Sequence, residues 1–189
     1  MSVATGKRCM SRMNAIVLTK YATPDALELR EVERPVPTGD EVLIKAHAAA
    51  VNDWDLAFVY GKPLFLRAIV GLLKPKNPII GCEVAGQIVA VGDNVRHRTP
   101  GKDVYGDLSE RGFGGYAEYV SVREESVTPM PRNLTYEQAV AIPHAALLAQ
   151  QALGAIARLR TGQSLLINGA GGGVVLSGYS WPNDKAQGR

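Results

Sequence analysis

The hydrophobic period of this sequence changes near Asn133, and this change limits most strongly how the chain can fold. Before that point, short apolar runs end at glycine and proline turns. In the run 41–50, Val42, Ile44 and the alanines that follow occupy every second position, as in a strand with one buried face. Many short strands separated by such turns predict a β-barrel or sandwich over about residues 14–132.

Beyond this boundary the apolar residues recur at helical spacing. Thr135 is expected to begin a short helix, because Gln138 completes a capping box with it. Pro143 suits the first turn of a second helix, which we expect to continue to about residue 159. A buried strand is predicted near 163–168. The sequence therefore predicts a fold that is mainly β, with α-structure at its carboxyl end.

A glycine-rich turn follows the predicted strand, and its residues are candidate cofactor contacts: Gly169, Gly171, Gly172, Gly173 and Val174. Glycines in such a turn let the backbone approach a pyrophosphate, whose charge then lies at the amino end of a helix. The long apolar helix expected after the turn is missing from the sequence. Residues 175–189 are mostly polar there and include Pro182.

The charge pattern excludes several classes of partner. The net charge is +3, and residues 1–13 carry three cations and no acid, so the remainder is balanced. This leaves no basic stripe for a nucleic acid, and charges and prolines interrupt every possible membrane span. Residues 1–13 are interpreted as a disordered leader, with a weak transit segment as the alternative. Two cysteines cannot form a disulfide framework, and we expect a cytoplasmic protein.

Seven motifs between residues 14 and 174 occur in the order and spacing of a known family: AIVLTKY, ERPVPTGDEVLIKAHAAAVNDWD, PIIGCEVAGQIVAVGDNV, PGKDVYGD, FGGYAEYV, AIPHAALLAQQAL and GQSLLINGAGGGV. With them the chain resembles the medium-chain dehydrogenase/reductase superfamily, in its zinc-independent quinone-oxidoreductase-like branch. The resemblance implies a GroES-like β-barrel at 14–132. It also implies the start of a Rossmann domain at 133–175, left incomplete, and a tail at 176–189 that departs from the family.

The resemblance also implies that no zinc is bound. Zinc-using relatives carry ligands at the positions that match Asn52 and Cys82, and this chain lacks their run of four cysteines. A set of Cys82, Glu83, His47 and His144 matches no known metal spacing. We therefore expect Cys82 to be a small buried strand residue and His47 to lie on the polar face of its strand.

The activity implied by the resemblance is hydride transfer from a nicotinamide to a quinone or an enone, with NADP(H) favoured over NAD(H). Asn52 is then a catalytic residue that faces the cofactor, or else only a helix cap. Trp54 and Tyr60 would line the substrate side, where Tyr60 delivers a proton or simply packs. His144 would contact the cofactor, or else meet solvent at the helix start.

A second hypothesis is that the chain is an inactive, truncated relative that acts as a binding module. The predicted strand at 163–168 would lack parallel neighbours and would leave apolar surface and an open edge. That predicts weak dinucleotide binding, and association with a second copy or capture by another chain. Substrate identity and the choice between NAD and NADP lie beyond these residues.

Overall fold

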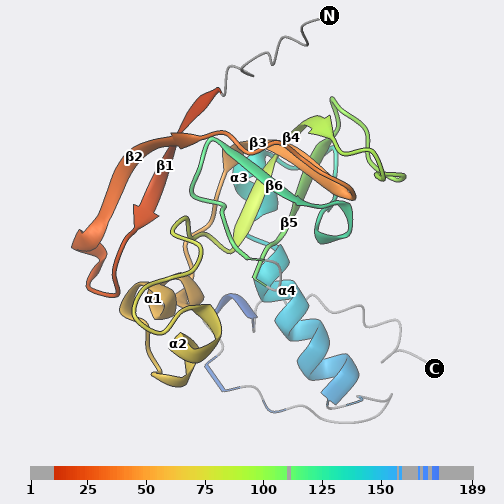
Figure 1. Cartoon of the computed structure of the whole chain (residues 1–189). Coiled ribbons are helices and arrows are strands. Elements are labelled where there is room, and N and C mark those ends of the chain that lie inside the picture. Colours follow the sequence, from red (N-terminus) through yellow and green to blue (C-terminus); the bar gives the residue numbers. More distant parts are fainter. Residues whose placement is uncertain are drawn as a thin grey trace, which may run out of the picture.

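The computed structural model describes residues 11–109, 112–156 and 158, together with 166, 168, 169 and 172–174. Figure 1 shows a β-structure in the amino-terminal part, a pair of short helices below it, and a longer helix leading toward the carboxyl end. Gly171, the tail at 176–189 and most of the strand predicted at 163–168 lie outside the described residues. Of that predicted strand, Leu166 and Asn168 are described, and neither lies in a strand.

A two-stranded antiparallel ribbon opens the described chain. Strand β1 (Arg12–Leu18) pairs with β2 (Leu27–Glu33), and the 3₁₀-helix η1 (Pro24–Ala26) joins them. The ribbon begins two residues before the expected boundary at Asn14, because Met13 is buried and paired with Val32. The leader predicted for residues 1–13 therefore extends too far by at least these two residues.

The main sheet has five antiparallel strands in the order β6-β3-β4-β5-β7. Their bounds are β3 (Glu41–Ala48), β4 (Glu83–Val91), β5 (Asp103–Asp107), β6 (Tyr119–Arg123) and β7 (Thr128–Pro129), with the 3₁₀-helix η2 (Glu124–Ser126) between the last two. Strands were predicted over residues 41–50 and 84–91, and β3 and β4 confirm them. The alternation in β3 holds only in part: Val42 and Ile44 are fully buried and His47 is exposed, but Leu43, at the opposite phase, is buried as well.

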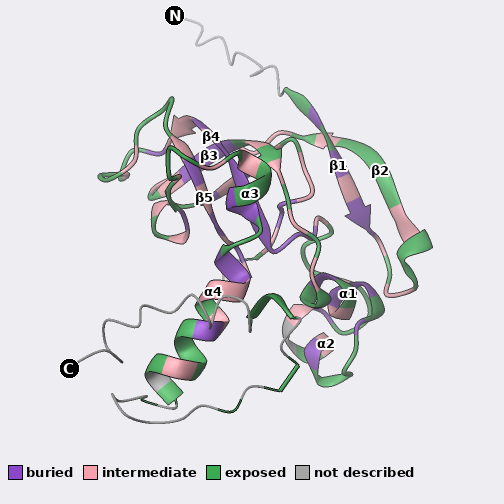
Figure 2. Ribbon diagram, turned by 180° about the vertical axis from the view of Figure 1, so that it is seen from behind, coloured by how far each residue is buried: buried purple, intermediate pink, exposed green. Residues whose placement is uncertain are grey.

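One face of this sheet carries the core. Figure 2 shows its strands buried and the outer half of the last helix exposed. The core cluster contains nine buried residues, almost all of them β-branched: Val42, Ile44, Val84, Ile88, Val104, Leu108, Val120, Val122 and Val127. Side chains of this kind pack well on a pleated surface, so the sheet is the structural base of the molecule.

Among the described residues, the sheet is accompanied by the α-helices α1 (Asp53–Tyr60), α2 (Phe65–Val70), α3 (Tyr136–Val140) and α4 (Pro143–Gln150). The predicted capping box of Thr135 and Gln138 is confirmed, and Pro143 occupies the first turn of α4. The regular helix expected to reach residue 159 ends at Gln150 and continues as the π-helix η3 (Gln151–Ile156). Within the described residues, no helix is both long and apolar enough to cross a membrane.

Candidate active site

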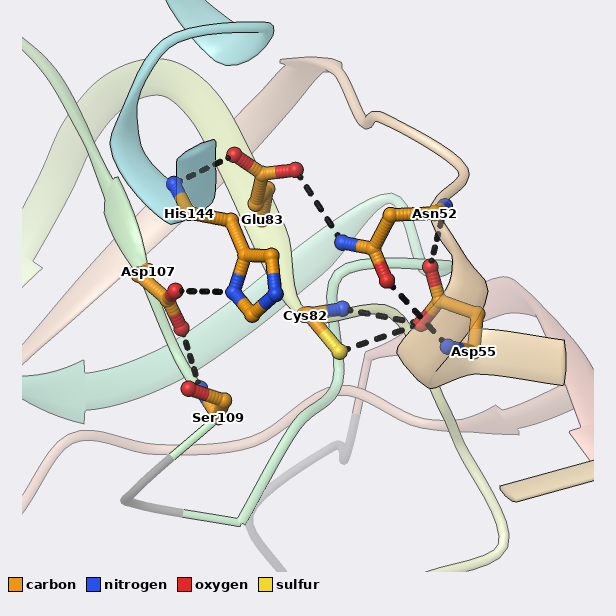
Figure 3. Close-up of polar contacts among 7 residues, drawn as sticks. All are labelled: Asn52, Asp55, Cys82, Glu83, Asp107, Ser109 and His144. Carbon is orange, nitrogen blue, oxygen red and sulfur yellow. Dashed lines mark hydrogen bonds and ion pairs between the residues drawn. The ribbon is translucent and has the colours of Figure 1, made fainter. Parts of the chain in front are cut away.

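Polar side chains from four elements meet beneath the sheet. Figure 3 shows the cluster: Asn52 and Asp55 come from the start of α1, Glu83 from the start of β4 and Cys82 from the position before it, Asp107 from the end of β5, and His144 from the first turn of α4. Asp55, Glu83 and His144 are the buried polar or charged residues of the described chain. Buried groups of this kind require hydrogen-bond partners.

Asp55 is the acceptor for donors from three segments. Its Oδ2 accepts from the backbone N–H of Asn52 at 3.0 Å and from the hydroxyl of Tyr116 at 2.8 Å. Its Oδ1 accepts from the backbone N–H and from the thiol of Cys82, each at 3.2 Å. Asp55 thereby holds the start of α1 against β4. Burial raises the pKa of the Tyr116 hydroxyl, and its hydrogen bond to Asp55 raises that pKa further.

Cys82 is confirmed as a small buried residue, although it lies immediately before the first residue of β4. Burial raises the pKa of its thiol, and the neighbouring Asp55 carboxylate raises it further. The sulfur is therefore a protonated donor to Asp55 rather than a thiolate. Since the thiolate is the nucleophile and the metal ligand, this environment disfavours either role.

We expect the thiol of Cys82 to be unreactive in the folded chain. In a Cys9→Ser variant, a disulfide reagent should label it at least on the order of a hundredfold more slowly in native buffer than in concentrated urea. The folded thiol holds its proton more tightly than an unfolded one, whose pKa is about 8.5. The raised pKa of Cys82 therefore adds to the free energy of unfolding in full below about pH 8.5. This contribution declines as the pH rises above that value. Equal labelling rates in buffer and urea would contradict this picture.

Glu83 links the start of α1 to the start of α4. Its Oε2 accepts from Nδ2 of Asn52 at 3.2 Å, and its Oε1 accepts from the backbone N–H of His144 at 2.9 Å. No side chain caps α4 from its own N-cap, Ile142, so the Glu83 carboxylate serves as acceptor at that helix end. Burial raises the pKa of Glu83, and its two hydrogen bonds oppose the shift.

His144 and Asp107 form a buried pair. Nδ1 of His144 lies 2.7 Å from Oδ2 of Asp107, whose Oδ1 accepts from the backbone N–H of Ser109 at 2.7 Å. The histidine is 7% exposed, and its Nε2 is buried without a hydrogen-bond partner among the described residues. A carboxylate on Nδ1 places the proton there and leaves Nε2 as the atom that can accept or release a second one.

A cavity of about 1100 Å³ borders this pair. His144 and Asp107 form part of its wall, and aromatic rings form another part: Trp54, Phe58 and Phe113. The Phe58 ring lies 5.8 Å from Trp54 and 4.1 Å from Phe113, measured between centroids. The cavity therefore offers a flat, apolar organic molecule a place to stack.

The structure brings together some of the predicted site residues and separates others. Asn52 is the N-cap of α1, with Oδ1 accepting from Asp55 N–H at 3.2 Å, so the capping role holds. Trp54 lines the cavity, whereas Tyr60 is not among its lining residues. His144 is buried, so it does not meet solvent as the alternative had it. His47 lies elsewhere, with its ring stacked on Tyr136 at 4.5 Å.

Four partners in the cluster were missed from the sequence: Asp55, Tyr116, Asp107 and Ser109. A local signal existed for Asp55, because Asn52-x-x-Asp55 has the spacing of a capping box. The others come from distant segments without a local pattern. Among the described residues, no group of three or more histidine, cysteine or acidic side chains is arranged to hold a metal ion.

The family model of the alcohol dehydrogenase GroES-like domain matches residues 38–132, which hold the whole five-stranded sheet and the residues of the polar cluster other than His144. The chain belongs to this family. The predicted fold class, mainly β with a GroES-like domain, is therefore confirmed, as is the resemblance to quinone-oxidoreductase-like members of the medium-chain dehydrogenases/reductases.

Similar proteins support the same placement. The chain is 35% identical to a mouse quinone oxidoreductase over 93% of its length and 50% of that protein, and 36% identical to a tomato 2-methylene-furan-3-one reductase over 87% and 42%. A mycobacterial structure complexed with NADPH superposes with a TM-score of 0.75 at 28% identity, covering 92% of this chain and 51% of that one. The chain thus spans about half the length of the curated relatives it matches.

Proposed function

We propose that this chain provides the substrate side of an NADPH-dependent reductase of quinones or α,β-unsaturated carbonyls. One observation carries the proposal: the buried His144–Asp107 pair forms part of the wall of a large cavity whose lining also includes the aromatic rings of Trp54, Phe58 and Phe113. The names of the mouse and tomato relatives support these two classes of acceptor. Both classes are conjugated carbonyls, which are electrophilic without a Lewis acid.

Substrate binding is assigned to the aromatic wall. A quinone or enone is planar and mainly apolar, so stacking on Trp54 and Phe113 would supply most of its contact area. Trp54 keeps the substrate-side role expected from the sequence. Tyr60 does not line the cavity, and its carbonyl oxygen accepts from the Arg67 guanidinium at 3.3 Å. We therefore leave Tyr60 out of the proposed chemistry.

The described part of the glycine turn fits a nicotinamide dinucleotide. Gly169 has a φ of +77°, and the Gly172 N–H closes a turn on its carbonyl at 3.0 Å. A Cβ placed on Gly173 would lie 3.6 Å from Cβ of Ala145, so the turn packs beside His144 on α4. Gly169, Gly172, Gly173 and Val174 would hold the phosphates, and the bound coenzyme supplies the hydride. NADPH is favoured because the mycobacterial neighbour was solved with it.

The proton that accompanies the hydride is assigned to His144. Asp107 holds Nδ1 and fixes the ring orientation, so Nε2, which has no hydrogen-bond partner among the described residues, is the nitrogen assigned to this proton. Glu83 accepts from the backbone N–H of His144 and from the amide of Asn52, so it holds the start of α4, which carries the ring. Asn52 is therefore a positioning residue in this scheme, and its predicted contact with the nicotinamide stays a prediction.

The competing hypothesis, a binding module without turnover, rests on the fraction of the relatives that the chain covers. The two hypotheses separate if a cofactor domain from a relative is joined after Val174 and NADPH oxidation is followed with a quinone and with an enone. We expect turnover that a metal chelator does not change. A folded fusion that oxidises no NADPH with either acceptor would refute the reductase proposal.

In the same fusion, His144→Gln should lower kcat by about a hundredfold, the usual scale of a lost proton donor, and change KM little. His97→Gln is the matched control, because His97 is exposed and does not line the cavity. An unchanged kcat in His144→Gln, with NADPH oxidation intact, would remove the histidine from the mechanism and leave the reductase proposal standing.

A further inference from the structure

A long stretch of the chain next to the cavity is basic and free of acids. Residues 56–82 contain no aspartate or glutamate and four cations: Lys62, Arg67, Lys74 and Lys76. The whole chain has a net charge of only +3, so this stretch alone exceeds the excess of the entire molecule. The three lysines are exposed, and none makes a salt bridge with a described residue.

Large apolar side chains are exposed between these cations. Leu64 and Phe65 are each 69% exposed at the amino end of α2, and Leu72 and Leu73 are 72% and 87% exposed just past its carboxyl end. A protein surface exposes single leucines routinely, but four large apolar residues within ten positions mark a contact surface. We call residues 62–76 the basic–apolar segment.

The basic–apolar segment has two faces. Leu66, Val70, Pro75 and Lys76 line the cavity, and Leu66 is buried. Leu64, Phe65, Leu72 and Leu73 are absent from the cavity lining. These four exposed apolar side chains are therefore not part of the proposed substrate site, and a ligand in the cavity would leave them uncovered.

The segment is held in a fixed shape. The Arg67 Nε donates to the carbonyl of Gly61 at 3.0 Å, and its guanidinium lies over the Tyr21 ring at 4.5 Å. The Tyr21 hydroxyl donates to the carbonyl of Gly71, and the Lys76 N–H returns to the carbonyl of Val70 at 2.8 Å. The Arg67 side chain is thus used within the fold, whereas Lys62, Lys74 and the four exposed apolar side chains lie on an anchored turn away from the cavity lining.

We propose that the basic–apolar segment docks the protein on an anionic phospholipid bilayer. Leucine and phenylalanine side chains enter the headgroup boundary, and lysines whose stems lie along them reach the phosphates. Each lysine near an anionic surface strengthens binding by about fivefold, and no acid in residues 56–82 opposes it. The expectation of no membrane partner rested on the missing span, and surface docking requires none.

The test is cosedimentation of the purified 189-residue chain with vesicles. Vesicles of phosphatidylcholine containing phosphatidylserine should bind it, and binding should fall as salt shortens the screening length from about 10 Å at 0.1 M. Combined replacement Lys62→Gln, Lys74→Gln and Lys76→Gln should weaken binding on the order of a hundredfold. Leu72→Ser with Leu73→Ser should weaken it by at least about tenfold.

Leu29→Ser and Lys102→Gln are the matched controls, because both side chains are exposed outside this segment; neither should change binding. Circular dichroism reports whether each variant folds. For a readout free of folding effects, a polarity-sensitive dye on Leu73→Cys, in a Cys9→Ser chain, should shift to the blue with anionic vesicles, and the same dye on Leu29→Cys should not.

Three results would overturn the proposal. The first is a folded chain that binds neither vesicle type. The second is equal binding to pure phosphatidylcholine that the lysine replacements leave unchanged, which would indicate apolar adsorption without headgroup recognition. The third is a dimer in sedimentation velocity that Leu72→Ser with Leu73→Ser disperses, without vesicle binding, which would make this face a contact between two copies.

Discussion

Replacing Asp55 with alanine is expected to lower the free energy of unfolding by about 3–5 kcal/mol. The variant would leave three donors without their acceptor in a buried position: the N–H groups of Asn52 and Cys82 and the thiol of Cys82. The Tyr116 hydroxyl would keep only its weaker bond to the carbonyl of Ala50, at 3.2 Å. The start of α1 would then separate from the start of β4.

Urea unfolding followed by circular dichroism measures this effect. Asp55→Asn should lie between the wild type and alanine, because its remaining oxygen still accepts while its amide meets donors on the other side. Asp53→Ala is the control, since Asp53 is exposed in the same turn of α1. If Asp55→Ala and Asp53→Ala lower the free energy of unfolding equally, the hydrogen bonds to Asp55 have no role in stability.

The elements that could be predicted from the sequence are those with local causes. Strand β3 follows from alternation within ten residues, and the start of α3 follows from Thr135 and Gln138, which bond each other across one turn. Each signal is complete within its own segment, so no knowledge of neighbours was needed. The end of α4 could not be predicted from a local pattern. The helical spacing of apolar residues continues to Leu159, yet the regular helix ends at Gln150.

The polar cluster could not be predicted in the same way, because its contacts join distant segments. His144 pairs with Asp107 across 37 positions and with Glu83 across 61. Which acid meets the histidine depends on the antiparallel register of β4 and β5, where Glu83 stands opposite Asp107. Hydrophobic alternation predicts that such strands exist and leaves their mutual register open. The resemblance pointed to positions 52 and 82 and left their partners unknown.

Gly86→Ala is expected to destabilise the chain by about 3 kcal/mol or more. Gly86 lies in the middle of β4, between Ala46 on β3 and Val104 on β5. A Cβ there would lie 2.1 Å from the backbone oxygen of Lys45. That atom belongs to the central strand pair, so it cannot retreat without opening the β3–β4 ladder, which already has register shifts beside Ala46.

The effect should reach the site, because β4 begins with Glu83, three residues before the substituted glycine. A displaced β4 weakens the bond from the His144 N–H to Glu83, so hydrogen exchange at that amide should accelerate along with the loss of unfolding free energy. Gly101→Ala is the control. Its Cβ would meet no atom within 4 Å, and its φ of +83° alone predicts a cost of about 1–2 kcal/mol. If Gly86→Ala lowered the free energy of unfolding less than Gly101→Ala, the strand pair would have room for a side chain. Close approach of the β3 and β4 backbones would then not explain the small residues along these strands.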